Sequence, residues 1–340
     1  MTQRRTAMRA VIVMAVATTL AFAAWLILRP AQNEAQAPTA APSSGASVVI
    51  DLAHHNFGVA ADFAPLSAWL ESEGFRVRAQ RGAFDRESLS GVQILIIKNA
   101  LAERNAISAQ PTDPEIARAW SLPTPSAFSP AEISALHEWV LGGGGLLLIF
   151  DHMPMPGAAR DLAAAFGIEV SNGNAVDARG LAPFNGQSVE RAGRAVFSRS
   201  DGTLADGPLT NGRKPSERVA SIASDGGSAF RLPAAAGPLL TLGTSFVSLL
   251  PEVAWRFSEA TARESVAGWS QGGVLRAGQG RLAVFGDGSI LMSPAMAASL
   301  GRWGGYTAGD APADFAESPR LLLNVLRWLS GSFDDDASSG

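Results

Sequence analysis

Apolar runs that end abruptly in polar residues are the feature that most constrains how this chain folds. Leu146 to Phe150 is apolar at every position and is followed directly by Asp151 and His152. A strand without alternation is buried on both faces, which is typical of parallel sheets covered by helices. Strand and helix patterns alternate along the chain. We therefore predict an α/β domain with a flavodoxin-like, mostly parallel sheet and helices on both faces.

Further strands and helices follow from similar patterns. The helix after residue 129 has the clearest start, because Ser129, Pro130 and Glu132 form a capping-box sequence. It ends at the glycine run Gly142 to Gly145. The other predicted strands are 48–51, 75–78, 93–97, 168–170 and 282–285. The other predicted helices are 63–70, 158–166 and 318–329.

Two long segments have no regular pattern. Arg104 to Phe128 contains four prolines, and loops of this length are often lids or binding loops. Residues 171–262 are rich in glycine and proline with scattered apolar runs, so we predict an irregular β-rich portion of the same domain. Residues 332–340 are predicted to be an acidic disordered tail, and the α/β domain spans 48–331.

The N-terminal segment predicts a membrane anchor. Ala10 to Leu28 is an apolar run whose roughly 28 Å helical length is close to the thickness of a hydrocarbon core. Three arginines precede it and one follows, which favours residues 1–9 in the cytoplasm and the rest outside an inner membrane, in the periplasm or outside the cell. A cleaved signal peptide is the alternative, because Ala35-Gln36-Ala37 resembles a cleavage site. Residues 29–47 form an Ala/Pro/Ser-rich tether in either case.

Composition excludes several classes of function. The chain has 340 residues and no cysteine, which removes disulfides, thiolate metal sites and cysteine nucleophiles. Its net charge is −4 without a basic block in the outer part, so nucleic acid is not a predicted partner. Hydrophobic residues make up 47%, enough for a sizeable core.

Polar residues gather at the predicted carboxyl ends of the strands. In open α/β sheets ligands bind in the crevice beyond these ends. We expect one shared site whose catalytic candidates are Asp51, His55, Asp151 and His152. Asn56, Asn99, Gln271 and Asp287 are the ligand-binding candidates. Adjacent residues on an extended segment point opposite ways, so at most one of His54 and His55 faces such a site.

The same residues have simpler interpretations. A polar residue after a strand is often only a turn former or helix cap, and this is the favoured interpretation of Asp287 between two glycines. His137 lies in a helix and is interpreted as a packed core histidine. Two histidines and two carboxylates would suit a divalent metal, but no HExxH-type spacing is present. No G-x-S-x-G elbow or phosphate-binding loop occurs either.

Several of these segments resemble a known group of proteins. They are 48–56, 128–133, 139–152, 269–272, 280–287 and 324–329. The chain resembles uncharacterised bacterial membrane-anchored proteins whose outer domain is class I glutamine amidotransferase-like and related to auxiliary domains of gliding-motility-type transporters. The resemblance implies this fold and an envelope or transporter partner. True amidotransferases use a cysteine nucleophile, which this chain does not have, so glutaminase activity is not expected.

Three functions remain open from the sequence. The first is an extracytoplasmic ligand- or partner-binding domain without catalysis. The second is a metal-assisted hydrolase that uses Asp51, His55, Asp151 and His152. The third is a structural part of an envelope or transport assembly. The ligand, the cofactor and the oligomeric state are not predicted.

Overall fold

A computed structural model describes residues 45–56, 59–103, 123–292 and 313–335. Residues Ser44–Gly340 form one compact unit. The predicted anchor Ala10–Leu28 and most of the predicted lid, 104–122, lie outside the described residues. Within the described ranges, no helix has the length and apolar character needed to cross a membrane.

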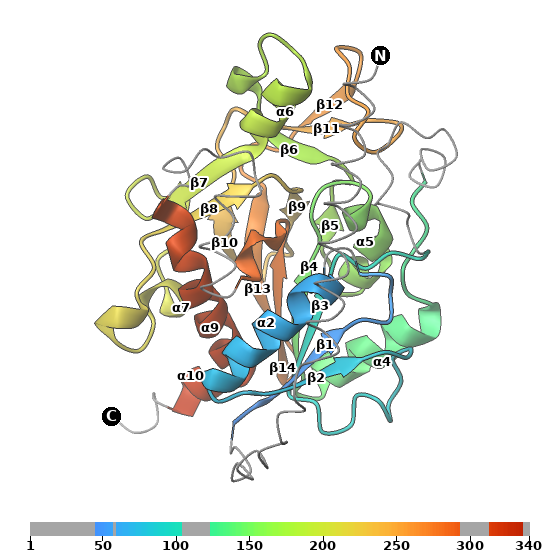
Figure 1. Cartoon of the computed structure of the whole chain (residues 1–340), viewed down its shortest axis with the longest axis vertical. Helices are drawn as coiled ribbons and strands as arrows, with labels where there is room; N and C mark the ends of the chain where they lie inside the picture. The colour runs from blue at the N-terminus through green and yellow to red at the C-terminus, as the bar shows by residue number, and fades with distance from the viewer. Residues whose placement is uncertain (1–44, 57–58, 104–122, 293–312, 336–340) are drawn as a thin grey trace, which may run out of the picture. The chain divides into compact units, whose positions relative to one another are not determined.

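A nine-stranded sheet forms the centre of the domain (Figure 1). Five neighbouring strands run parallel in the order β2-β1-β3-β4-β14, an order typical of flavodoxin-like sheets. They are β1 (Ser47–Asp51), β2 (Arg76–Gln80), β3 (Ile94–Lys98), β4 (Gly145–Ile149) and β14 (Gly280–Phe285). The prediction of a central, fully buried parallel strand at Leu146–Phe150 is confirmed, because these five side chains are at most 1% exposed.

Helices cover both faces of this parallel part. On one face, α2 (Val59–Ser72) and α9 (Ser318–Leu329) pack on Ile50, Ile96 and Leu147. On the other face, α4 (Pro130–Leu141) and α5 (Met155–Ala165) pack on the alternate strand residues, such as Leu95 and Leu148. Figure 1 shows α2 and α9 on the near side of the strands. The predicted covering of both faces is therefore confirmed.

The other half of the sheet is antiparallel, so the sheet is mixed. β13 (Ser270–Ala277) pairs antiparallel with β14 across a tight turn, and β10 (Gly237–Thr241) and β9 (Phe230–Arg231) pair with β13. β5 (Glu169–Val170) closes the edge beside β9. Sequence analysis missed β13, because its Gly272 and Gly273 are weak strand formers. Both glycines allow close packing, since a Cβ at Gly272 would lie 2.8 Å from the Leu240 side chain.

Residues 171–262 contain most of the remaining strands. β6 (Asn174–Asp177), β11 (Phe246–Leu250) and β12 (Ala262–Ser265) form an antiparallel three-stranded sheet. β7 (Arg194–Ser198) and β8 (Ser221–Asp225) form a separate pair. The helices α6 (Gly186–Gly193) and α7 (Pro208–Asn211) lie between them in sequence.

The C-terminal end differs from the prediction of a disordered tail after 332. A short helix, α10, occupies Ser332–Asp335. The reason is that Phe333 packs against the core cluster on the α2 and α9 face, so this part of the tail is held by apolar contact.

Candidate functional site

The carboxyl ends of the parallel strands bring most of the predicted site residues to one edge of the sheet. Asp51 ends β1, Asn99 follows β3, and Asp151 and Asp287 each lie two residues beyond β4 and β14. Since Phe285 of β14 is in register with Ile149 of β4, Asp151 and Asp287 occupy equivalent places on neighbouring strands.

Hydrogen bonds connect these strand ends in a row. Asn56 Nδ2 donates to Asp51 Oδ2 at 3.0 Å and to the backbone oxygen of Lys98 at 2.9 Å. The next residue, Asn99, donates from Nδ2 to Asp151 Oδ2 at 2.6 Å and accepts from the Asp151 N–H at 2.9 Å. Asp151 Oδ1 in turn accepts from the Gly288 N–H. The row therefore runs from β1 through β3 and β4 to β14.

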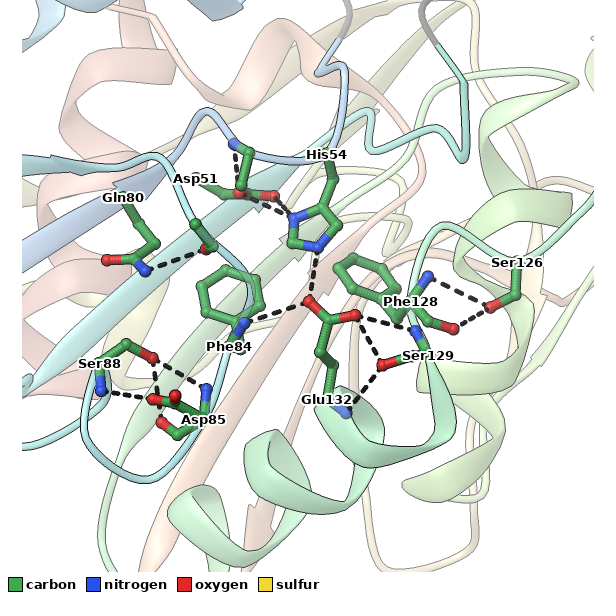
Figure 2. A network of polar contacts seen from close by, with 12 residues as sticks. Asp51, His54, Gln80, Phe84, Asp85, Ser88, Ser126, Phe128, Ser129 and Glu132 are labelled. Carbon is green, nitrogen blue, oxygen red and sulfur yellow. Dashed lines mark hydrogen bonds and ion pairs between the residues drawn. The ribbon is translucent and has the colours of Figure 1, made fainter.

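At the β1 end, a buried histidine lies between two carboxylates, as Figure 2 shows. His54 Nδ1 is 3.0 Å from both oxygens of Asp51, and Nε2 is 2.9 Å from Glu132 Oε1. The rings of Phe84 and Phe128 pack on the imidazole at centroid distances of 5.1 and 4.7 Å. We call Asp51, His54, Asn56 and Glu132 the His54 cluster.

Both nitrogens of His54 must donate, because each faces a carboxylate that is already surrounded by donors. Asp51 also accepts from the N–H of Ala53, and Glu132 accepts from the N–H groups of Phe84 and Ser129. Burial alone would lower the pKa of His54, but Asp51 and Glu132 outweigh it and raise this pKa. Burial opposes ionisation of Glu132, yet its hydrogen bonds lower its pKa to about 2. The cluster is thus an imidazolium between two carboxylates.

This geometry gives the His54 cluster a structural role. A catalytic base needs an unprotonated nitrogen within reach of a substrate, and His54 offers none. The expectation that His55 faces the site fails, because His55 is exposed and His54 contacts Asp51 instead. His55 has a φ of 47°, in the left-handed region, so the backbone turns sharply at this residue.

At the β4 and β14 end, two carboxylates lie closer to the surface. Asp287 accepts from the N–H groups of Asp225 and Ser289 at 2.8 Å and from the Ser224 hydroxyl. It therefore acts as a cap, as the turn interpretation expected. Burial and the neighbouring charge of Asp151 raise the pKa of Asp287 to about 7. Asp287 is therefore protonated more readily than an ordinary aspartate.

His152 lies beside this pair and is covered by a tryptophan. Its ring centroid is 3.9 Å from that of Trp255 in an edge-to-face arrangement. Trp255 is 40% exposed and has a φ of 67°, which is an outlier for a bulky side chain. Burial lowers the pKa of His152, against the charge of Asp151, so the ring is neutral. His137, by contrast, packs on Phe166 from its helix, but it is half-buried and not in the core as predicted.

Three buried polar atoms without a hydrogen-bond partner lie around Gly226, next to these residues. They are His152 Nδ1, Asn174 Oδ1 and Gln271 Oε1. Gln271 Nε2 is 3.5 Å from the Gly226 oxygen, and a Cβ at Gly226 would lie 3.9 Å from the His152 ring. Asn174 Oδ1 lies near Gly226 as well, because a Cβ added at Gly193 would be 3.4 Å from Gly226 Cα and 3.9 Å from Asn174 Oδ1. We call Asn99, Asp151, His152, Asn174, Trp255, Gln271 and Asp287 the Asp151 cluster.

The arrangement does not provide a metal site. Across the described ranges, no group of three His, Asp or Glu side chains is placed to hold a metal ion. In the His54 cluster the imidazole separates the two carboxylates, and both of its nitrogens are in hydrogen bonds to them. The geometry therefore gives no support to the divalent metal considered from the sequence.

Two surface hollows lie away from both clusters. One is lined by Trp139 and the glycines 142–144 at the amino end of β4, and the other by Arg179, Val196 and Phe246. Neither includes a predicted site residue or a buried polar atom without a partner. The Asp151 cluster is therefore the better candidate for a binding site.

Sequence reasoning missed several members of the two clusters. The sequence assigns Glu132 only to the capping box. Its second oxygen contacts His54, which is 78 residues away in sequence, and no local pattern predicts such a contact. Asn174 and Trp255 come from the irregular portion, where no pattern places a residue near β4. The one sequence signal for Trp255 is that it is an isolated tryptophan in a Gly- and Pro-rich segment.

Comparison with known proteins identifies the fold but not a family. No protein-family model and no curated protein matches the chain. The solved mmIFT52 N-terminal domain is similar with a TM-score of 0.52 and 14% identity, over 83% of this chain and 97% of that chain. A ThuA-like protein from Bacteroides uniformis has a TM-score of 0.43, 12% identity, and coverage of 86% and 95%. A GMP synthase protein from Thermoplasma acidophilum has a TM-score of 0.40, 9% identity, and coverage of 87% and 98%. At these identities the likeness concerns the fold alone.

Proposed function

We propose that the chain is a membrane-anchored, extracytoplasmic ligand-binding domain of amidotransferase-like fold that has no catalytic role. In this proposal the ligand binds at the Asp151 cluster, on the carboxyl edge of β4 and β14. The anchor and the outer location are supported by the apolar segment Ala10–Leu28 and its flanking arginines. The partner, an envelope or transporter protein, stays a prediction from the resemblance.

The residues argue against catalysis of the amidotransferase type. The chain has no cysteine, so no thiolate nucleophile is available. The buried histidine His54 at the sheet edge has both nitrogens engaged by Asp51 and Glu132. The thiolate nucleophile of such an enzyme is therefore absent, and His54 is not free to act as its base.

One observation carries the binding proposal: three buried polar atoms without partners lie beside an exposed tryptophan in a strained conformation. A buried polar atom without a hydrogen bond costs about 1–3 kcal/mol, and strained backbone conformations concentrate at ligand sites. Both costs are offset if a ligand supplies the missing hydrogen bonds and covers the indole. The position beyond the carboxyl ends of parallel strands is also where α/β sheets bind ligands.

A thermal-shift screen tests the proposal. Full-length protein in detergent would be screened against a library of small metabolites, alongside the variants Asp151→Asn and His55→Gln. A ligand at 100 times its Kd adds about 2.7 kcal/mol of stability. We expect compounds that raise the Tm of the wild type and of His55→Gln, but not of Asp151→Asn. If every stabilising compound acts equally on all three proteins, the site is not the Asp151 cluster.

A hydrolase is the second candidate, and one observation favours it. Asp151 and Asp287 lie at the ends of neighbouring strands, and the pKa of Asp287 is raised to about 7, as is the pKa of the acid in some hydrolases. Turnover of ester, glycoside or amide substrates by the wild type, lost in both Asp151→Asn and Asp287→Asn, would replace the binding proposal by this one.

A further inference from the structure

We infer that the Asp151 cluster binds a neutral, polyhydroxylated ligand whose hydroxyl groups meet Gln271, Asn174 and Asp151 while its carbon skeleton covers Trp255. This inference rests on the proposed binding function and adds the chemical class of the ligand. It follows from the hydrogen-bonding atoms, the charges and the exposed aromatic ring of the cluster.

The buried atoms of the cluster that have no partner are mainly acceptors. Gln271 is 1% exposed and its Oε1 has no partner, while its Nε2 faces the carbonyl oxygens of Gly226 and Ser228 at 3.5 and 3.4 Å. Turning the amide over would set its oxygen against those two carbonyl oxygens, so the free atom is the oxygen. Each Asp151 oxygen accepts one hydrogen bond and has a further lone pair. A ligand here must bring several donors.

Charged groups of both signs border the cluster. Asp225, which donates its N–H to Asp287, is paired with Arg194 at 3.0 Å. The Lys98 and Asp151 side chains both lie against Gly288. A Cβ added at Gly288 would be 2.6 Å from Lys98 Cε and 2.9 Å from Asp151 Oδ1, so the two side chains are close to each other. A cationic ligand would therefore meet Lys98, and an anionic one would meet Asp151 and Asp287. A neutral donor-rich ligand avoids both conflicts.

Hydroxyl groups fit the remaining atoms better than amides do. His152 Nδ1 is a donor or an acceptor depending on its tautomer, and a hydroxyl can serve either. The 40% exposed indole of Trp255, held edge-to-face by His152, provides an apolar surface at the outer side of the cluster. Carbon-bound hydrogens of a polyol or sugar ring can pack on such a surface while the hydroxyls point inward.

Matched probes separate the ligand classes. Full-length protein would be kept in an amine-oxide detergent, because sugar-based detergents would compete. D-glucose and myo-inositol are the neutral probes, and D-glucosamine and D-glucuronate carry the same ring with one positive or one negative charge. Binding would be measured by saturation-transfer NMR and titration for the wild type, Trp255→Ala, Gln271→Met and the control Val196→Ala, which alters an exposed residue on β7.

We expect saturable binding of at least one neutral probe and at least about tenfold weaker binding of its charged analogue. Trp255→Ala and Gln271→Met should each weaken this binding about threefold to tenfold, the loss expected for one contact, while Val196→Ala leaves it unchanged. Trp255 is exposed, so its variant keeps the test valid if Gln271→Met does not fold.

Other outcomes overturn the inference in distinguishable ways. If a charged probe binds better than the neutral ones and Trp255→Ala weakens it, the ligand class is wrong but the binding function stands. If no probe binds saturably, while other compounds stabilise the wild type but not Asp151→Asn, the class is again wrong. If neutral probes bind equally to all four proteins, the site is not the Asp151 cluster, and the proposed function fails with the inference.

Discussion

At the scale of single residues, the neighbouring histidines His54 and His55 have different environments. His54 is buried between Asp51 and Glu132, whereas His55 points to solvent. Removing one member of a buried ion pair leaves an uncompensated charge and costs about 3–5 kcal/mol. We expect His54→Gln to lower the free energy of unfolding by several kcal/mol in urea denaturation followed by circular dichroism.

The neighbouring histidine provides the control for this prediction. His55→Gln should change the free energy of unfolding by less than about 0.5 kcal/mol, as surface substitutions do. Equal effects of the two substitutions would contradict the assignment of His54 to the buried cluster.

The His54 cluster also predicts how stability depends on pH. The pKa of His54 is raised in the folded state. Its contribution to stability is therefore fully present below its unfolded pKa of about 6.5, and it is lost as the pH rises through the folded pKa. Glu132 has a folded pKa of about 2, so it contributes stability at pH values above about 4.5. This contribution is lost as the pH falls through the folded pKa. The Tm of the wild type should decline at alkaline pH more steeply than that of His54→Gln. Parallel curves for the two proteins would contradict the imidazolium.

Asp287 predicts a second pH effect of separate origin. Its folded pKa of about 7 is well above the value near 3.9 in an unfolded chain. The folded state therefore loses stability as pH rises from about 4 to 7, because ionisation is favoured only after unfolding. Asp287→Asn removes this titration, so we expect a flatter dependence of Tm on pH over that range. An unchanged slope would show that Asp287 ionises normally.

At the scale of elements, one side chain at the start of α4, that of Glu132, both caps the helix and contacts His54. Ser129 and Glu132 form the capping box, and the same Glu132 carboxylate binds His54. Ser129→Ala should cost about 1 kcal/mol, the usual value of a cap. Glu132→Gln should cost more, because it also removes the charge that faces His54. A double-mutant cycle of Glu132→Gln with His54→Gln should show strong coupling, and additive effects would contradict the contact.

The elements show where prediction from sequence succeeds and where it ends. The strands around Ile50, Ile96 and Leu148 and the helices after Ser129 and from Ser318 were predicted, because their apolar period and caps are local signals. Strand β13 and the strands of residues 171–262 were not located, since glycines and short lengths weaken such signals. For the site, the strand-end residues were predicted, but Glu132, Asn174 and Trp255 were not, because only tertiary contact brings them there.

At the scale of the whole molecule, the fold places two different clusters along one sheet edge. The His54 cluster, at β1, is buried and hydrogen-bonded throughout, so it stabilises the edge. The Asp151 cluster, at β4 and β14, has an aspartate with a raised pKa, polar atoms without partners and an exposed tryptophan. The row of Asn56 and Asn99 hydrogen bonds connects the two, so a rigid end supports the end that we propose to bind a ligand.

The location of this domain remains a prediction of the arginine asymmetry around Ala10–Leu28. Protease added to spheroplasts should digest the domain. A cytoplasmic marker protein in the same sample serves as the control and should stay intact. Protection of both proteins in intact spheroplasts would contradict the outer location.

The central claim is that the Asp151 cluster is a ligand site, and a crystal structure of the full-length protein with a compound that stabilises the wild type but not Asp151→Asn tests it most directly. The account predicts ligand density against Trp255, with hydrogen bonds to Gln271 Oε1 and to Asp151. Density at another surface, with Gln271 Oε1 and His152 Nδ1 bonded to other protein atoms, would contradict it.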